Sequence, residues 1–277
     1  MVAIPKCLVQ RFWSPVIHGL FFRHGKNSGD DSFCVAWNLV RAGGIALCNA
    51  KVFPLFSNTR GGVRVPSLLT MAVGGVSLKV CCKPEEGDQA LIYFGGNAED
   101  VSYSLADFSK AFPDHALYMP HYRGYSGSGG NPTEKDLLGD AQALLEMVSQ
   151  KHQKITIVGR SLGTGIAVWL AAHNKVDCLV LITPYDSILN LACQKFPFLP
   201  VQWLLKDRYE SIQWASRVIC PTKILAADRD EIIPMRNTLA LFEAFKPGIA
   251  TMDVIQGTNH NSISDSPVFM KALTSFK

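Results

Sequence analysis

Short β-prone runs alternate with helical segments along most of the chain, and this alternation constrains the fold more than any other feature. The first two runs, at 67–73 and 76–82, flank the pair Gly74-Gly75, which predicts an antiparallel hairpin. The pattern then predicts strands at 90–94, 116–119, 155–158, 178–182, 222–227 and 251–255, and helices at 100–111, 133–150, 162–173, 236–245 and 264–275. Because parallel strands are usually joined by helical crossovers, we expect an α/β fold with a mainly parallel, doubly wound sheet behind an N-terminal hairpin.

One segment breaks this rhythm. Residues 184–221 hold four prolines and helical fragments rich in Phe, Trp and Leu. Strands of the same rhythm lie on both sides of it, so we interpret about 185–217 as a short helical cap inserted into a single domain that spans 61–277. Residues 1–60 precede that domain as an N-terminal extension of unassigned role.

The net charge of +4 is unevenly distributed along the chain. Residues 1–60 hold seven Lys or Arg and two acidic residues, whereas 61–277 hold 20 and 21. A nearly neutral domain argues against a nucleic-acid partner. The acid-poor start with interleaved aromatics is typical of transit peptides and membrane-surface segments, but Lys6, Arg11 and His18 interrupt any spanning helix. Two roles stay open for the extension, which are peripheral membrane contact and packing on the domain.

Eight cysteines are spread along the chain without any C-x-x-C pair or zinc-ligand spacing. Several lie inside apolar, strand-like runs, which is typical of reduced, buried thiols in a cytoplasmic protein. We therefore expect no metal site, and a cytoplasmic location unless residues 1–60 bring the protein to a membrane.

The strongest chemical signal is the spacing Gly159-x-Ser161-x-Gly163, placed between the strand at 155–158 and the helix at 162–173. A serine on such a tight turn has strained backbone angles, and its neighbours two residues away must be small. The helix N-terminus places N–H groups and a positive dipole end beside the hydroxyl. The motif therefore predicts a nucleophilic serine.

A serine hydroxyl needs a base to remove its proton and an acid to orient that base. His260 follows the strand at 251–255, whereas His173 lies on the same helix as the motif and too close to it. Asp228 and Asp230 both follow the strand at 222–227, on the edge where parallel sheets carry their sites. These residues alone leave the choice between the two aspartates open.

A glycine-containing loop, Gly95-Gly96-Asn97, follows the strand at 90–94. Glycines let a backbone approach a substrate closely, so we predict that the N–H groups of Asn97 and Leu162 form an oxyanion hole. A simple strand-to-helix turn is the alternative.

From about residue 67 to 277 the chain resembles the α/β-hydrolase superfamily, in particular its serine-aminopeptidase-like branch related to the yeast bud-emergence protein. The motifs that carry the resemblance are, in chain order, Phe94-Gly95-Gly96-Asn97-Ala98, Tyr122-Arg123-Gly124-Tyr125-Ser126-Gly127-Ser128, Gly159-Arg160-Ser161-Leu162-Gly163, Thr183-Pro184-Tyr185, Asp230-Glu231-Ile232-Ile233-Pro234 and Asn259-His260-Asn261. Their joint order is far more specific than any one of them.

The resemblance implies an α/β-hydrolase fold, Ser161 as nucleophile and His260 as general base, without a metal or organic cofactor. The acid of this branch precedes two branched apolar residues and proline, which favours Asp230 over Asp228. Two positions depart from the branch. Gly95 stands where relatives commonly have His, and His121 stands where they often have Asp or Asn.

We therefore predict a serine hydrolase that cleaves an ester or thioester of an apolar, small-molecule acyl substrate through an acyl-enzyme. The absence of an acidic cluster in the cap argues against binding a peptide's free amine, although an amide stays open. The aromatic and leucine side chains of the cap either line an acyl pocket or pack on the sheet. The alternatives are a peptidase or acyltransferase with the same triad, or a non-catalytic binding protein. The oligomeric state is not predicted.

Overall fold

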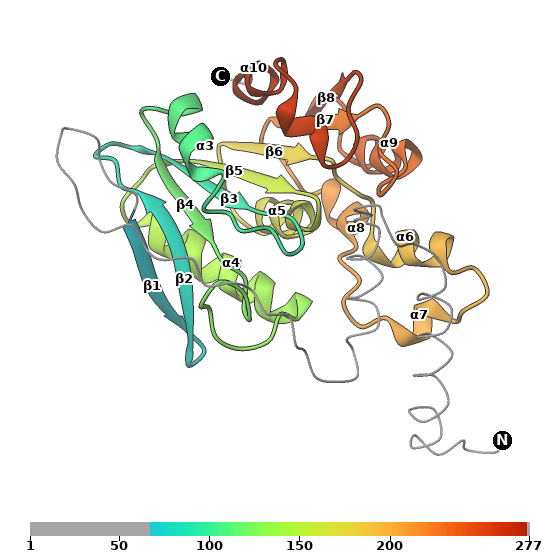
Figure 1. Ribbon diagram of the computed structural model, residues 1–277, viewed down its shortest axis with the longest axis horizontal. Coiled ribbons are helices and arrows are strands. Elements are labelled where there is room, and N and C mark those ends of the chain that lie inside the picture. Colours follow the sequence, from blue (N-terminus) through green and yellow to red (C-terminus); the bar gives the residue numbers. More distant parts are fainter. Residues whose placement is uncertain (1–66, 276–277) are drawn as a thin grey trace, which may run out of the picture.

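The computed structural model of the protein describes residues 67–275. An eight-stranded sheet runs through this part of the chain in the order β1-β2-β4-β3-β5-β6-β7-β8 (Figure 1). Strands β1 (Ser67–Val73) and β2 (Val76–Lys83) form the expected antiparallel hairpin, and β2 also pairs antiparallel with β4. Gly74 and Gly75 turn the hairpin with φ of 56° and 79°, a left-handed region that favours glycine.

The remaining strand pairs are parallel, as the alternation predicted. These strands are β3 (Gln89–Phe94), β4 (Ala116–Pro120), β5 (Lys154–Arg160), β6 (Cys178–Ile182), β7 (Thr222–Ala227) and β8 (Ala250–Ile255). Phe94 pairs with Gly159, Arg160 with Ile182, and Ala227 with Ile255. The last residues of these strands therefore share one edge of the sheet, where their following loops meet.

Side chains alternate between two apolar cores, one on each face of the sheet. In β3, for example, Ile92 faces one core and Leu91 the other. Helices α4 (Glu134–Ser149), α5 (Leu162–His173) and α9 (Met235–Ala244) cover the first face, whereas α3 (Leu105–Ala111) and α10 (Phe269–Thr274) cover the second (Figure 1). The sheet is thus doubly covered.

Two predicted helices are shorter than expected. The helix predicted at 100–111 begins at Leu105, because the Asp100 carboxylate accepts hydrogen bonds from the N–H and hydroxyl of Ser102 and holds a turn there. The helix predicted at 264–275 splits into a 3₁₀ turn, Ser262–Asp265, and α10. Pro267 lies within the break, and a proline disfavours helical angles in the residue before it.

The cap leaves the sheet at the end of β6 and returns at β7. It contains α6 (Ile188–Lys195), α7 (Val201–Leu204) and α8 (Ser211–Ala215), and Figure 1 shows α6 and α7 projecting beyond the sheet. Ala192, Val201 and Leu205 form a small core of their own there. The predicted helical cap is therefore present.

The described cysteines are free thiols, and burial raises the pKa of Cys81 to about 11 and that of Cys82 to about 12. Cys178 and Cys220 are buried as well, whereas Cys193 is half-buried. Between residues 67 and 275, no helix is long and apolar enough to span a bilayer, and no three side chains gather as metal ligands. The predictions for residues 1–60, and for Cys7, Cys34 and Cys48, lie outside the described residues.

Candidate active site

Ser161 occupies a strained turn between β5 and α5. Its φ of 48° and ψ of −116° lie in a region that residues with a side chain seldom adopt. The flanking glycines are sterically required: a Cβ on Gly159 would lie 2.6 Å from the carbonyl oxygen of Gly163, and one on Gly163 would lie 2.1 Å from that of Phe94. Both obstacles are backbone atoms, so the turn cannot accept larger residues without moving the sheet or the helix.

The imidazole of His260 bridges Ser161 and Asp230. Its Nε2 lies 2.9 Å from the Ser161 Oγ, and its Nδ1 lies 2.8 Å from the Asp230 Oδ2. Both side chains are withdrawn from solvent, with 6% of His260 and 5% of Asp230 exposed. The other oxygen of Asp230, Oδ1, accepts N–H hydrogen bonds from Ile232 and Ile233 at 3.0 and 2.7 Å, which fixes the carboxylate's orientation.

Asp228 has a different role in the same loop. Its Oδ1 accepts the N–H of Thr258 at 2.9 Å and so ties the end of β7 to the loop that carries His260. The backbone donors of Gly257 and Thr258 hold the pKa of Asp228 below its usual range. Of the two aspartates that the sequence left open, Asp230 is the one in contact with the histidine.

The predicted oxyanion loop passes beside the serine. A Cβ on Gly96 would lie 3.6 Å from the Cβ of Ser161, an ordinary contact distance, so the two segments are direct neighbours. The N–H of Gly96 donates to the Glu99 carboxylate at 2.6 Å and is therefore occupied within the loop. Asn97 follows it, half-buried, and Leu162 is the first residue of α5, whose N–H has no acceptor within the helix. Both predicted donors thus belong to segments in contact with Ser161.

Glu99 and Arg160 brace this loop, and the sequence reasoning did not single out either of them. The Glu99 carboxylate accepts hydrogen bonds from the Tyr93 hydroxyl at 2.7 Å and the Ser104 hydroxyl at 3.2 Å. The Arg160 guanidinium lies 3.5 Å from Glu99 and also 3.5 Å from the carbonyl oxygen of Asn261, next to His260. The sequence offered two signals for this pair, which are an acidic residue two positions after Asn97 and a basic residue directly before the serine.

The departure at Gly95 has a steric cause in this chain. A Cβ at Gly95 would lie 2.7 Å from Val101 and 3.3 Å from the Glu99 carboxylate, so a histidine, which the resemblance would lead us to expect, is crowded out here. The Tyr122 hydroxyl instead donates to the carbonyl oxygen of Gly95 at 2.7 Å. Glu99 and Tyr122 together support the loop.

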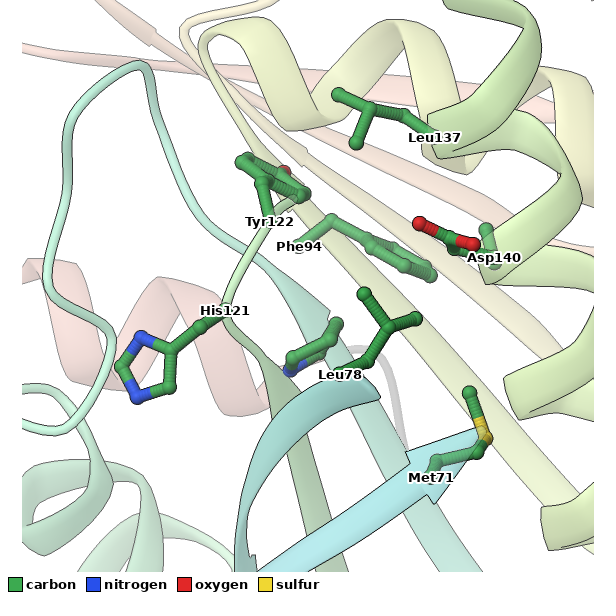
Figure 2. A pocket seen from close by; sticks show the side chains of 9 residues that line it. Met71, Leu78, Phe94, His121, Tyr122, Leu137 and Asp140 are labelled. Atoms are coloured by element: carbon green, nitrogen blue, oxygen red, sulfur yellow. The ribbon is translucent and has the colours of Figure 1, made fainter. Parts of the chain in front are cut away.

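His121, the other departure, lies outside the serine site. Its Nε2 is 3.2 Å from the Cys81 Sγ, and burial lowers its pKa. It borders a cavity of about 10 Å³ next to Phe94 and Leu78, which has room for one water molecule at most. Figure 2 shows the His121 ring turned away from those two side chains. Such a cavity is too small for an acyl substrate.

The apolar cap residues divide into two groups. Trp214 is partly buried against the core of the sheet, as the packing alternative predicted, whereas Leu205 and the partly buried Phe196 pack in the small core of the cap itself. A second group faces solvent, namely Phe198, Leu199, Trp203 and Leu204. These exposed side chains neither pack on the sheet nor fill an enclosed pocket.

A doubly wound sheet with a strained serine after β5, and with an acid and a histidine after β7 and β8, defines an α/β-hydrolase. A family model described as the alpha/beta hydrolase fold matches residues 89–212. An uncharacterized protein of Mycobacterium tuberculosis is 32% identical over 197 residues, which cover 68% of this chain and 69% of that protein. The chain belongs to the α/β-hydrolase superfamily.

Two further proteins are similar to this chain. Human alpha/beta hydrolase domain-containing protein 17B is 27% identical over 204 residues, covering 71% of this chain and 68% of the human one. The structure of the Pyrococcus furiosus esterase Pf2001 superposes with a TM-score of 0.63 at 15% identity, over 76% of this chain and 89% of that one. This superposition confirms the α/β-hydrolase fold. The narrower resemblance to the branch of the yeast protein stays a prediction.

Proposed function

We propose that the protein is a serine hydrolase that cleaves an ester or thioester of an apolar acyl group. The observation that carries the proposal is the buried imidazole of His260, within hydrogen-bond distance of both the Ser161 hydroxyl and the Asp230 carboxylate. A nucleophile, a base and an orienting acid in contact meet the geometric requirement for acyl transfer.

The reaction would begin at the Ser161 hydroxyl. With Nδ1–H donated to Asp230, the Nε2 lone pair of His260 accepts the hydroxyl proton as Oγ attacks the carbonyl carbon. Negative charge then develops on the carbonyl oxygen, where the N–H groups of Asn97 and Leu162 and the N-terminal dipole of α5 stabilise it.

The acyl-enzyme forms when the tetrahedral intermediate collapses. His260 returns its proton to the leaving alcohol or thiol, and Ser161 keeps the acyl group as an ester. Water next loses a proton to His260 and attacks this ester, and His260 then gives that proton to the departing Ser161 Oγ, which releases the acid and restores the free serine. Asp230 stays ionised throughout and stabilises the imidazolium.

Two observations support the substrate class, namely the charge of the cap and the similarity to a solved esterase structure. From residue 187 to 206 the cap carries no acidic side chain that could bind a peptide's free amine, which favours an uncharged acyl substrate. The structurally similar Pyrococcus protein is described as an esterase. Fold likeness supports the class of reaction and leaves the substrate to experiment.

A fluorophosphonate probe tests the nucleophile directly, since it labels activated serines. We expect the wild-type protein to be labelled and to hydrolyse p-nitrophenyl esters, whereas Ser161→Ala should lose both activities. Ser109→Ala is the control, because that hydroxyl is bound to the carbonyl oxygen of Leu105 on α3. Unchanged labelling of Ser161→Ala would place the nucleophile elsewhere. A folded wild-type protein without labelling or turnover would favour a binding protein.

An ester and a thioester of the same acyl chain, assayed in parallel, separate the two leaving groups. Because attack on the carbonyl uses the same residues in both, Ser161→Ala should abolish both reactions. Persistence of either reaction in that variant would assign it to another site.

A further inference from the structure

Among residues 67–275, the cap carries an exposed apolar patch. The side chain of Phe198 is 97% exposed and that of Trp203 is 81% exposed, and each is followed by an exposed leucine, Leu199 or Leu204. We call Phe198, Leu199, Trp203 and Leu204 the cap patch. Soluble proteins seldom place an aromatic pair fully in water, since each ring loses the free energy of burial.

The segment that carries the patch is held in place by its own contacts. Val201 and Leu205, on the opposite side of α7, are buried with Ala192 of α6. Backbone hydrogen bonds join Leu199 to Phe196, and Trp203 to Pro200. Inward apolar residues therefore anchor the turn and point the cap patch outward.

Exposed cations flank the cap patch in the sequence. No acidic residue occurs from 187 to 206, whereas Lys195 and Lys206 are both exposed. Arg208 donates to the carbonyl oxygen of Gln202 at 2.6 Å, next to Trp203, and Arg236 donates to the Gln194 side chain at 2.7 Å, next to Lys195. The acid that follows, Asp207, accepts the N–H of Glu134 at the start of α4.

We propose that the cap patch docks on the surface of an anionic lipid bilayer. Exposed Phe and Trp side chains are those that enter the boundary between headgroups and acyl chains, while Lys and Arg bind the anionic headgroups. Exposed aromatic side chains next to Lys195 and Lys206, in a stretch without acids from 187 to 206, fit this partner better than they fit a neutral protein surface.

The position of the cap patch gives the docking a consequence. The cap leaves β6 at the same sheet edge as Ser161, because Ile182 pairs with Arg160 (Figure 1). A bilayer bound at the cap patch would therefore lie near the edge of the sheet that carries Ser161. The docking itself does not depend on the proposed hydrolase activity.

The full chain is tested for co-sedimentation with vesicles of phosphatidylcholine that contain about one third phosphatidylserine. We expect the double variant Phe198→Ser with Trp203→Ser to bind about tenfold or more weakly, because two rings no longer leave water. The matched control is Ile219→Ser with Val268→Ser. Those side chains are also exposed, at 66% and 51%, but lie outside the cap. The control should bind as the wild type does.

A second pair of variants tests the charge. Lys195→Glu with Lys206→Glu should weaken binding to the anionic vesicles and leave the weaker binding to pure phosphatidylcholine unchanged. Fluorophosphonate labelling in the absence of vesicles should be equal in all variants. That readout separates failure of docking from failure of the proposed catalysis.

Three results would overturn the proposal. The first is wild-type protein that does not bind the vesicles, and the second is equal binding by the aromatic double variant, which would assign membrane contact to another segment. The third is a wild-type dimer that this double variant dissociates, which would identify a second copy of the chain as the occupant.

Discussion

Replacing Asp230 with asparagine changes a single group in the buried hydrogen-bond chain that ends at Ser161. The asparagine oxygen is expected to stay where Oδ1 now accepts the N–H groups of Ile232 and Ile233. The opposite orientation would turn the amide N–H₂ toward those two donors and leave them unpaired, at about 1–3 kcal/mol each. The N–H₂ must therefore face Nδ1 of His260.

This orientation reverses the histidine tautomer. Facing an N–H₂ donor, Nδ1 must act as acceptor, so the ring proton moves to Nε2, which then has no lone pair for the Ser161 proton. In a serine protease, the equivalent change lowers kcat by about 10⁴-fold, or about 5.5 kcal/mol in activation free energy. We expect a loss of this size in Asp230→Asn, with the fold unchanged.

The assay is kcat for a short p-nitrophenyl ester, with the rate of fluorophosphonate labelling as a second measure. Asp228→Asn is the matched control, because its carboxylate binds the N–H of Thr258 and not the imidazole. It should keep activity within about tenfold of the wild type. A loss below tenfold in Asp230→Asn, or a larger loss in Asp228→Asn than in Asp230→Asn, would refute the assignment of the acid.

Three further predictions concern the serine turn, the loop before α3 and a buried histidine outside the site. Gly163→Ala forces a methyl group to within 2.1 Å of the carbonyl oxygen of Phe94 and should lower kcat by at least about 100-fold. The control is Gly139→Ala, because Gly139 is exposed on α4 and a Cβ there would have no atom within 4 Å. That variant should stabilise the protein by about 0.5–1 kcal/mol in urea unfolding. In Glu99→Gln, an N–H₂ group would face the donors whose hydrogen bonds the Glu99 carboxylate now accepts, so kcat should fall about tenfold with little change in KM. Kinetics equal to those of the wild type would show that Glu99 does not support the predicted oxyanion loop. Burial lowers the pKa of His121 in the folded protein, so as the pH falls the unfolded chain binds a proton at this histidine before the folded protein does. The folded state therefore loses stability as the pH falls below about 6.5. The difference in unfolding free energy between wild type and His121→Asn should therefore shrink from about pH 7.5 to about pH 5.5, and a constant difference would contradict the shift.

The fold was predictable because its signals are local. Apolar runs with a strand's period, helical repeats of apolar residues and glycine pairs act over a few residues, so the hairpin, the parallel strands and the cap are all found where they were expected. The ends of two helices were wrong for an equally local reason, since the side chain of Asp100 and the ring of Pro267 compete with helix formation.

The cap shows where a local pattern stops being informative. Its apolar residues allowed both a pocket lining and a packed face. The packing of Val201 and Leu205 against α6 decides that Phe198 and Trp203 point to solvent. In so short a helix, neighbours set the orientation, because no periodicity can develop over four residues.

By itself, the sequence determined the class of fold and the kind of chemistry to look for. The spacing of Gly159, Ser161 and Gly163 follows from backbone sterics within one turn, and the strand order brings the later acid and histidine to the same edge. Only the tertiary structure decided which atoms meet. Asp230 contacts His260 while Asp228 does not, and Glu99 lies between the oxyanion loop and Arg160. Contacts between residues as far as 99 positions apart depend on how loops pack across strand ends, and no local pattern encodes that packing.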